Sequence, residues 1–279
     1  MSSEVRGPAV AGRLYPDDPG ALTTLVQELF DAAPAAPAPA SDPPVLGAVV
    51  PHAGLRYSGV CAARVLARLG APEVAIVLAP NHTGRGDPAG RASVFASGAF
   101  AIPTGHVSVD AALADALLAA TTELVVDRSA HVDEHAIEVE LPLMQARWPG
   151  ASIVPIVISS VQVARCLSLG ASMASVLHAW PARVLLLASS DLTHHEEAAS
   201  AARKDRCALE RIQLLDARGL LEVCARESMT MCGRGPVAVM LEACRRLGAV
   251  GAEVVDYRHS GWVNGDTRNV VSYAGVVVR

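Results

Sequence analysis

Short apolar runs rich in β-branched residues alternate along the chain with longer Ala- and Leu-rich stretches of helical spacing. The apolar runs are the predicted strands, and four of them are VLGAVV (45–50), VAIVLA (74–79), SIVPIVIS (152–159) and RVLLLAS (183–189). Such near-continuous apolar strands are typical of parallel strands buried on both faces. The alternation therefore predicts βαβ units in a single α/β domain over residues 1–279, with a mainly parallel central sheet flanked by helices.

The remaining segments complete this predicted domain. Helices are expected over SGVCAARVLARLG (58–70), AIEVELPLMQARW (136–148) and QVARCLSLGASMASVLHAW (162–180). Near the C-terminal end, EVVDYRHSG and NVVSYAGVVV flank a turn rich in Gly, Asn and Asp, which predicts a late β-hairpin at one edge of the sheet. The proline-rich AAPAAPAPASDPP (32–44) disfavours helix and predicts an extended connector between a short N-terminal helix and the first core strand.

Composition and charge narrow the class of partner. The chain of 279 residues is 51% hydrophobic and 18% charged, with a net charge of −5. Since it has no dense run of Lys and Arg, we expect binding neither to nucleic acid nor to an anionic membrane surface. No apolar run approaches the roughly 18 residues of a membrane span, and the start lacks a signal-peptide pattern, so we expect a cytoplasmic protein whose partners are small molecules or proteins.

The six cysteines are scattered without a CxxC pair, which argues against a disulfide framework or a zinc ribbon. Cys232 differs from the others because it directly precedes a predicted helix with Pro236 in its first turn. The helix dipole and the neighbouring Arg234 would favour its thiolate. Three interpretations stay open for Cys232: a ligand, a nucleophile or a small buried residue.

Polar residues that can bind metals or transfer protons follow three of the predicted strands. His52 follows VLGAVVP, His82 follows VAIVLAPN, and Asp191 with His194 follows RVLLLASS. Because ligand crevices in open α/β sheets lie beyond the carboxyl ends of the strands, these residues predict one shared site. A lone histidine at a strand end is more often a turn or core residue, so the prediction depends on the convergence of all three.

The other histidines divide into two groups. His131 and His135 bracket the acidic VDE just before a predicted helix, close in sequence to a candidate carboxylate. His106, His178 and His259 are isolated and have no strand-end setting. We expect these three to be structural or surface residues.

Six motifs, in order along the chain, resemble those of one protein family and together span essentially the whole sequence. They are PAVAGRLYP, VVPHAGLRYSG, APNH, DEHAIEVELPLM, SSDLTHH and MCGRGPV. The chain resembles the Memo family, whose prokaryotic members are called AmmeMemoRadiSam system protein B. That family is similar in fold to the class III extradiol ring-cleaving dioxygenases, so the resemblance implies a dioxygenase-like α/β fold with a pocket of the non-haem-iron type.

The resemblance also implies a metal site. His52, His82 and Cys232 match the family's metal-site residues, and Asp191 and His194 match further residues of its pocket. The implied cofactor is one divalent or redox-active metal ion. Extradiol dioxygenases hold Fe(II) with two histidines and a carboxylate, whereas a thiolate is softer and leans toward copper or zinc. We expect iron or copper, with zinc as the alternative.

On the dioxygenase-like interpretation, three residues carry the proton chemistry. His194 or His135 would move protons to and from a substrate hydroxyl or a bound oxygen species. Asp191, three residues before His194, would orient an imidazole and raise its basicity.

Three further residues are candidate substrate contacts: Tyr57, Arg234 and Glu134. An arginine could pair with a substrate carboxylate through two parallel hydrogen bonds. Glu134 has a second interpretation, in which it orients one of the metal-site histidines or joins the ligands. For Tyr57 and Arg234 an ordinary solvated or capping role is at least as common.

Two functions of different class follow. The first is metal-dependent redox chemistry with O₂ on a small molecule. The alternative is a non-catalytic metal- or peptide-binding accessory protein that uses the inherited pocket; the resemblance implies adaptor roles in eukaryotes, and the prokaryotic family name implies radical-SAM pathway neighbours as partners. A zinc hydrolase is disfavoured, because the chain has no HExxH motif.

Overall fold

The strands of the central sheet carry apolar side chains on both faces. In the computed structural model, which describes residues 4–33 and 44–279, Val49 packs into the core on one side of the sheet, and Ala48 and Val50 pack into the core on the other. Successive residues of a strand point to opposite faces, so a strand without polar positions needs cover on both sides. The prediction of doubly buried central strands is confirmed.

The centre of the sheet is parallel and its outer parts are mixed. The four central strands are β2 (Gly47–Val50), β9 (Val184–Ser189), β3 (Val74–Pro80) and β8 (Ser152–Ile158), which pair in parallel in that spatial order. The outer strands are β4 (Ala92–Val94), β7 (Leu124–Val126), β10 (His194–Glu196), β11 (Ala252–His259) and β12 (Val270–Val278). The order is β10-β12-β2-β9-β3-β8-β4-β7, with β11 on β12. Because β12 and β4 join antiparallel to β2 and β8, the predicted parallel core is confirmed within a mixed sheet.

The last two strands form the predicted hairpin. In β11 and β12, Ala252 lies opposite Val278 and His259 lies opposite Ser272. Their connection contains the short helix α9 (Gly261–Asn264), which ends at Gly265 with a φ of +78°, a conformation that glycine adopts at low cost. The hairpin extends the sheet beside β2.

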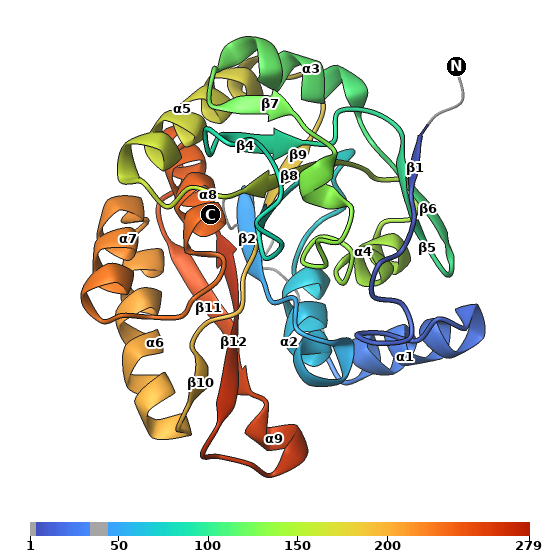
Figure 1. Cartoon of the computed structure of the whole chain (residues 1–279), viewed down its shortest axis with the longest axis vertical. Coiled ribbons are helices and arrows are strands. Elements are labelled where there is room, and N and C mark those ends of the chain that lie inside the picture. Colours follow the sequence, from blue (N-terminus) through green and yellow to red (C-terminus); the bar gives the residue numbers. More distant parts are fainter. Residues whose placement is uncertain (1–3, 34–43) are drawn as a thin grey trace.

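Helices cover the two faces of the sheet as separate layers (Figure 1). One layer consists of α3 (Ala111–Ala120), α5 (Val163–Ala179), α6 (Ala198–Gln213), α7 (Ala217–Arg226) and α8 (Arg234–Arg246). The other consists of α1 (Pro19–Asp31), α2 (Leu55–Ala67) and α4 (Leu141–Arg147). A small sheet of β1 (Val5–Arg6), β5 (Ala99–Ile102) and β6 (Gly105–Ser108) and the 3-10 turn η1 (Ser129–His131) complete the structure. The predicted class, a single α/β domain like that of the extradiol dioxygenases, is confirmed.

One predicted helix is much shorter than its sequence pattern suggests. The helix expected over 136–148 begins only at Leu141, and the five residues before it form turns. In these turns the Glu138 carboxylate is buried and accepts hydrogen bonds from the backbone N–H groups of Ala9 at 2.8 Å and Val10 at 3.0 Å. Tertiary hydrogen bonds therefore override the helical spacing.

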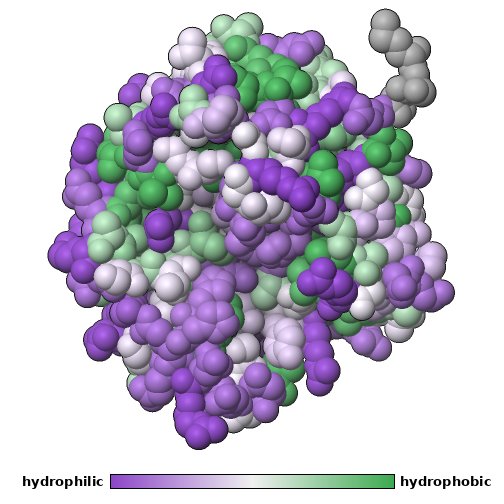
Figure 2. Space-filling view, viewed as in Figure 1, coloured by the Kyte–Doolittle hydropathy of each residue, from purple (hydrophilic) through white to green (hydrophobic). Residues whose placement is uncertain are grey.

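The helices expected over 58–70 and 162–180 are confirmed as α2 and α5, each starting within about three residues of the expected position, and the short N-terminal helix expected before the connector is α1. Most of the proline-rich connector, residues 34–43, lies outside the described residues. Within the described part of the chain, no helix is both long and apolar enough to cross a bilayer. On the face drawn in Figure 2, apolar patches such as the one over α3 alternate with polar side chains.

The buried pair Arg6–Glu138 ties the N-terminal segment to these turns. Arg6 is 6% exposed and Glu138 is fully buried, and Glu138 also accepts a hydrogen bond from the Tyr15 hydroxyl. Removing one member of such a pair leaves an uncompensated buried charge, which typically costs about 3–5 kcal/mol.

We therefore expect Glu138→Gln to lower the free energy of unfolding in urea by about 3–5 kcal/mol. The matched control is Glu222→Gln, which removes the exposed i,i+4 partner of Arg218 and should cost under about 1 kcal/mol. Equal losses in the two variants would show that the buried pair does not anchor the N-terminal segment.

Candidate metal centre

His52 lies immediately beyond strand β2 and is 1% exposed. Two groups from the end of β9 hold it. The Asp191 carboxylate accepts the backbone N–H groups of His52 at 3.0 Å and Ala53 at 3.3 Å, and the Ser189 hydroxyl lies 2.7 Å from the His52 Nδ1 atom. Ser189 therefore holds the His52 ring at Nδ1, and Nε2 is the ring nitrogen that remains for a ligand.

His82 follows strand β3, and a buried carboxylate orients it. Glu134 Oε1 lies 2.8 Å from the Nδ1 atom of His82, and Oε2 accepts the backbone N–H of the same residue at 2.6 Å. Glu134 is 2% exposed and also accepts the N–H groups of His135 and Ala136. Carboxylate–histidine pairs of this kind set the tautomer of metal-ligating imidazoles. Here Nε2 is the His82 nitrogen that remains for an ion.

Cys232 comes from the loop that enters helix α8. Its Sγ atom lies 3.3 Å from His52 Nε2 and 3.7 Å from the Asp191 carbonyl oxygen. The loop approaches this closely because the next residue is Gly233: a Cβ there would collide with the Ser189 carbonyl oxygen. Any side chain at position 233 would push the thiol away from the strand ends.

The three residues converge on one point in space. One ligand atom each from His52, His82 and Cys232 lies within 4.8 Å of the others. Two ligands of one ion, each about 2.0–2.3 Å from it, cannot lie farther apart than that. These distances allow the three side chains to hold a single metal ion.

A second donor cluster is also compact, but it arises from hydrogen bonding. His82, Glu134 and His135 have potential ligand atoms within 4.8 Å of one another. The closest pair in it is the His82–Glu134 hydrogen bond, and Glu134 Oε1 already accepts two backbone N–H groups. The carboxylate is thereby occupied in holding His82 and serves as its support.

His135 borders the cluster, and His194 follows Asp191 along the chain. The His135 ring stacks on His82 with centroids 4.5 Å apart and stands edge-on to His52 at 5.5 Å. His194 begins the short strand β10, where its Nδ1 lies 2.9 Å from the Leu192 carbonyl oxygen. Burial lowers the pKa of both His135 and His194, and repulsion from His82 lowers both further.

Burial also sets the protonation of the central residues. It lowers the pKa of His52, with the nearby histidine rings adding to the shift, and it raises the pKa of the Cys232 thiol, with the Asp191 carboxylate adding to that shift. The expected thiolate stabilisation by Arg234 is not found, because its guanidinium donates to the Met229 carbonyl oxygen at 3.0 Å. A bound cation would supply the missing positive charge, since metal binding deprotonates a coordinating thiol.

Asp191 has a different task from the one expected. Its carboxylate oxygen accepts two backbone N–H groups of the His52 loop, so it positions that loop rather than orienting an imidazole ring. Burial raises the pKa of Asp191 to about 7, and these two hydrogen bonds oppose the rise.

The three candidate substrate contacts are placed differently from one another. Glu134 is committed to His82. Arg234 borders a separate cavity of about 360 Å³ beside α7. Tyr57 lies in the first turn of α2 and is partly exposed. Burial raises the pKa of the Tyr273 phenol, and Asp191 and Tyr57 add to that rise.

Sequence reasoning missed Ser189, the residue that holds His52. It is fully buried, and its hydroxyl donates to the Ala136 carbonyl oxygen at 3.0 Å. The signal was a polar residue closing the apolar run LLLAS, two positions before Asp191. The sequence does not indicate a role for this serine, because its contact with His52 exists only once the ends of β2 and β9 lie side by side.

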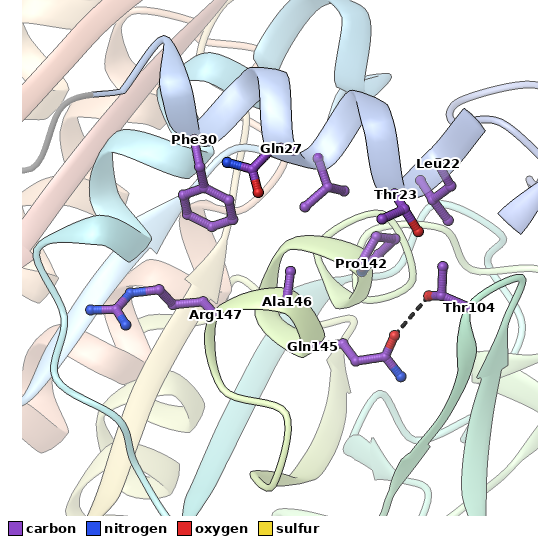
Figure 3. A pocket seen from close by; sticks show the side chains of 10 residues that line it. Leu22, Thr23, Gln27, Phe30, Thr104, Pro142, Gln145, Ala146 and Arg147 are labelled. Atoms are coloured by element: carbon purple, nitrogen blue, oxygen red, sulfur yellow. Dashed lines mark hydrogen bonds between the residues drawn. The ribbon is translucent and has the colours of Figure 1, made fainter. Parts of the chain in front are cut away.

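A cavity of about 370 Å³ lies away from this chemistry, between α1 and α4. Figure 3 shows Leu22, Gln27 and Phe30 along α1, facing Pro142 and Ala146 of α4. Its other polar groups are largely paired within the protein; the Thr104 hydroxyl, for example, donates to Gln145. The candidate ligands therefore line the strand ends, and this groove is separate from them.

Comparison with known proteins agrees with the fold and the motifs. A family model for Memo-like proteins matches residues 6–277. A MEMO1 family protein of Methanopyrus kandleri is 37% identical, over 98% of this chain and 99% of its own. Those of Methanosarcina barkeri and Methanobrevibacter smithii are 36% and 35% identical, over 98% and 99% of this chain and all of their own lengths. The chain belongs to the Memo family.

Proposed function

We propose that this chain binds one metal ion through His52, His82 and Cys232 and carries out metal-dependent redox chemistry with O₂ on a small molecule. The observation that carries the proposal is the approach of three donor atoms to within 4.8 Å, from three separate segments of the chain. Nothing in core packing requires two imidazoles and a thiol to meet at the strand ends.

The donor set favours a redox-active ion. Two neutral imidazoles and a thiolate suit copper and zinc, and iron is the metal of dioxygenases with the related fold. We propose iron or copper, with zinc as the alternative. When bound, the ion would supply electron transfer and the activation of O₂, while the protein supplies the positions of the groups around it.

His194 is the proposed proton-transfer residue. Because its Nδ1–H donates to the Leu192 carbonyl oxygen, the opposite nitrogen Nε2 is left as the base. The His194 backbone N–H donates to the Thr230 hydroxyl at 2.7 Å, which fixes the residue at the start of β10. His135, stacked on His82, is the second candidate for the same role.

The first test is metal content. Protein purified without air should carry close to one ion per chain by elemental analysis, and Cys232→Ser and His52→Ala should lose most of it, since each removes a ligand. The control is Cys207→Ser, which changes a partly exposed thiol on α6. Equal metal content in all four proteins would exclude the proposed ligands.

The second test concerns the support of His82. Glu134→Gln should weaken metal binding by about 10- to 100-fold, because loss of a carboxylate behind a ligating imidazole has that effect in other metal sites. The matched control is Asp133→Asn, the exposed neighbour that pairs with Arg85. If both variants bind the ion as tightly as the parent protein, Glu134 does not support a ligand.

The third test separates the enzyme from the accessory protein. Iron- or copper-loaded protein should consume O₂ with catechols or other small anionic substrates, and His194→Ala should lower the rate by about 10²- to 10⁴-fold. His178→Ala on α5 is the control. Ligand binding without O₂ consumption beyond that of the free ion, unchanged by His194→Ala, would replace the enzyme with a non-catalytic binding protein.

A further inference from the structure

A cavity of about 360 Å³ adjoins the loop that connects α7 to α8, residues 227–233. Its apolar lining comes from Leu221 of α7, Met229 of this loop and Val161, which precedes α5. The described residues that line it include none of the proposed metal ligands. Cavities of about 300–1,000 Å³ are typical of small-molecule sites. The size and the apolar walls therefore suit a small molecule that does not bind at the metal centre.

Arg234, the first residue of α8, is the charged residue of this cavity. Of the described residues in the lining, it alone carries a charge. It is partly buried, and its Nη1–H donates to the Met229 carbonyl oxygen at 3.0 Å. Its Nε–H and Nη2–H groups have no hydrogen-bond partner among residues 4–33 and 44–279. These two groups form one edge of the planar guanidinium, and that edge matches the two oxygens of a carboxylate.

The other polar groups of the lining are uncharged and do not compete for the guanidinium. Burial raises the pKa of Cys224 to about 11, and the Arg234 charge opposes that rise, so the thiol keeps its proton at neutral pH. Ser228 has a φ of +48°, which glycine adopts at a lower cost than serine does. The Ser228 hydroxyl lines the cavity and bonds to no other described residue. The cavity therefore offers a cation and a free hydroxyl beside its apolar walls.

We propose that this cavity is a binding site for a small carboxylate with an apolar body. The carboxylate accepts two parallel hydrogen bonds from Nε and Nη2 of Arg234, and the apolar body packs against Leu221 and Met229. The site goes beyond the proposed redox function, because it uses neither the metal ion nor its ligands.

The bond from Arg234 to Met229 prepares this site for its ligand. It joins the start of α8 to the loop before it and holds the guanidinium in place. A side chain that is already fixed loses less conformational entropy when a ligand binds. A lysine at position 234 would keep the positive charge, but an ammonium group does not present the planar pair of N–H groups that a carboxylate matches.

The test is titration of the ¹⁵N-labelled protein with hexanoate and, in parallel, with benzoate, so that a chain and a ring are both tried. Saturable ¹H–¹⁵N shifts should appear at the amides of the residues that line the cavity. Hexanamide has the same apolar body without the charge, so it should bind about 10- to 100-fold more weakly than hexanoate. Inorganic phosphate has charge without an apolar body, so it should also bind more weakly than hexanoate.

Two variants separate the contributions of the charge and of the space. Arg234→Lys should weaken hexanoate binding by about 10-fold, and its control is Arg206→Lys, at an exposed arginine of α6 outside the lining. Ala225→Trp should fill the cavity and prevent binding while it leaves Arg234 in place, because Ala225 is an exposed residue of the lining in the last turn of α7. Its control is Ala119→Trp, at an exposed alanine in the last turn of α3.

Absence of saturable shifts at the cavity amides with both hexanoate and benzoate overturns the proposal. Parent-like affinity for hexanoate in Arg234→Lys or in Ala225→Trp overturns it too, and the second variant, at an exposed position, serves if the first does not fold. Shifts centred on His52 and His82 would place the ligand at the metal centre instead. Binding of hexanamide or phosphate as tight as that of hexanoate would contradict the class of ligand.

Discussion

A buried carboxylate must be paired or neutralised, and this constraint organises the turns between η1 and α4. Glu134 pairs with His82, and Glu138 pairs with Arg6 and Tyr15. Glu140 has no hydrogen-bond partner among the described residues, and burial raises its pKa well above the usual value. Glu134 joins the turns to the end of β3, and Glu138 joins them to the N-terminal segment. The shape of the site follows from where the Glu134 and Glu138 carboxylates find partners.

The parallel sheet makes this arrangement effective. Its strands β2, β3 and β9 end at one edge, and each end delivers a residue to the centre: His52, His82 and Ser189 with Asp191. The loop before α8 adds Cys232 from the same side, which it reaches because Gly233 has no side chain to collide with β9. The ends of β2, β3 and β9 and the loop before α8 therefore bring together potential ligand residues that are far apart in sequence.

The donors, more than the fold, decide what such a site can do. Folds related to the extradiol dioxygenases support several chemistries, so the Memo-family assignment leaves the reaction to the residues themselves. As a ligand, Cys232 would make the site softer than the carboxylate of an extradiol dioxygenase does, and it would make the site sensitive to oxidation.

Apolar periodicity and motifs are local properties of the chain, and they were enough to predict the parallel core, the strand ends and the candidates His52, His82 and Cys232. Only the tertiary structure shows which side chains hold the candidate ligands in place. Ser189 is 137 positions from His52, and Asp191 is 139 positions from it, so neither partner could be read from spacing. The same applies to the shortened α4, whose helical pattern gave way to hydrogen bonds from the N-terminal segment. Hydrogen-bond partners depend on distances that exist only once the strand ends are assembled.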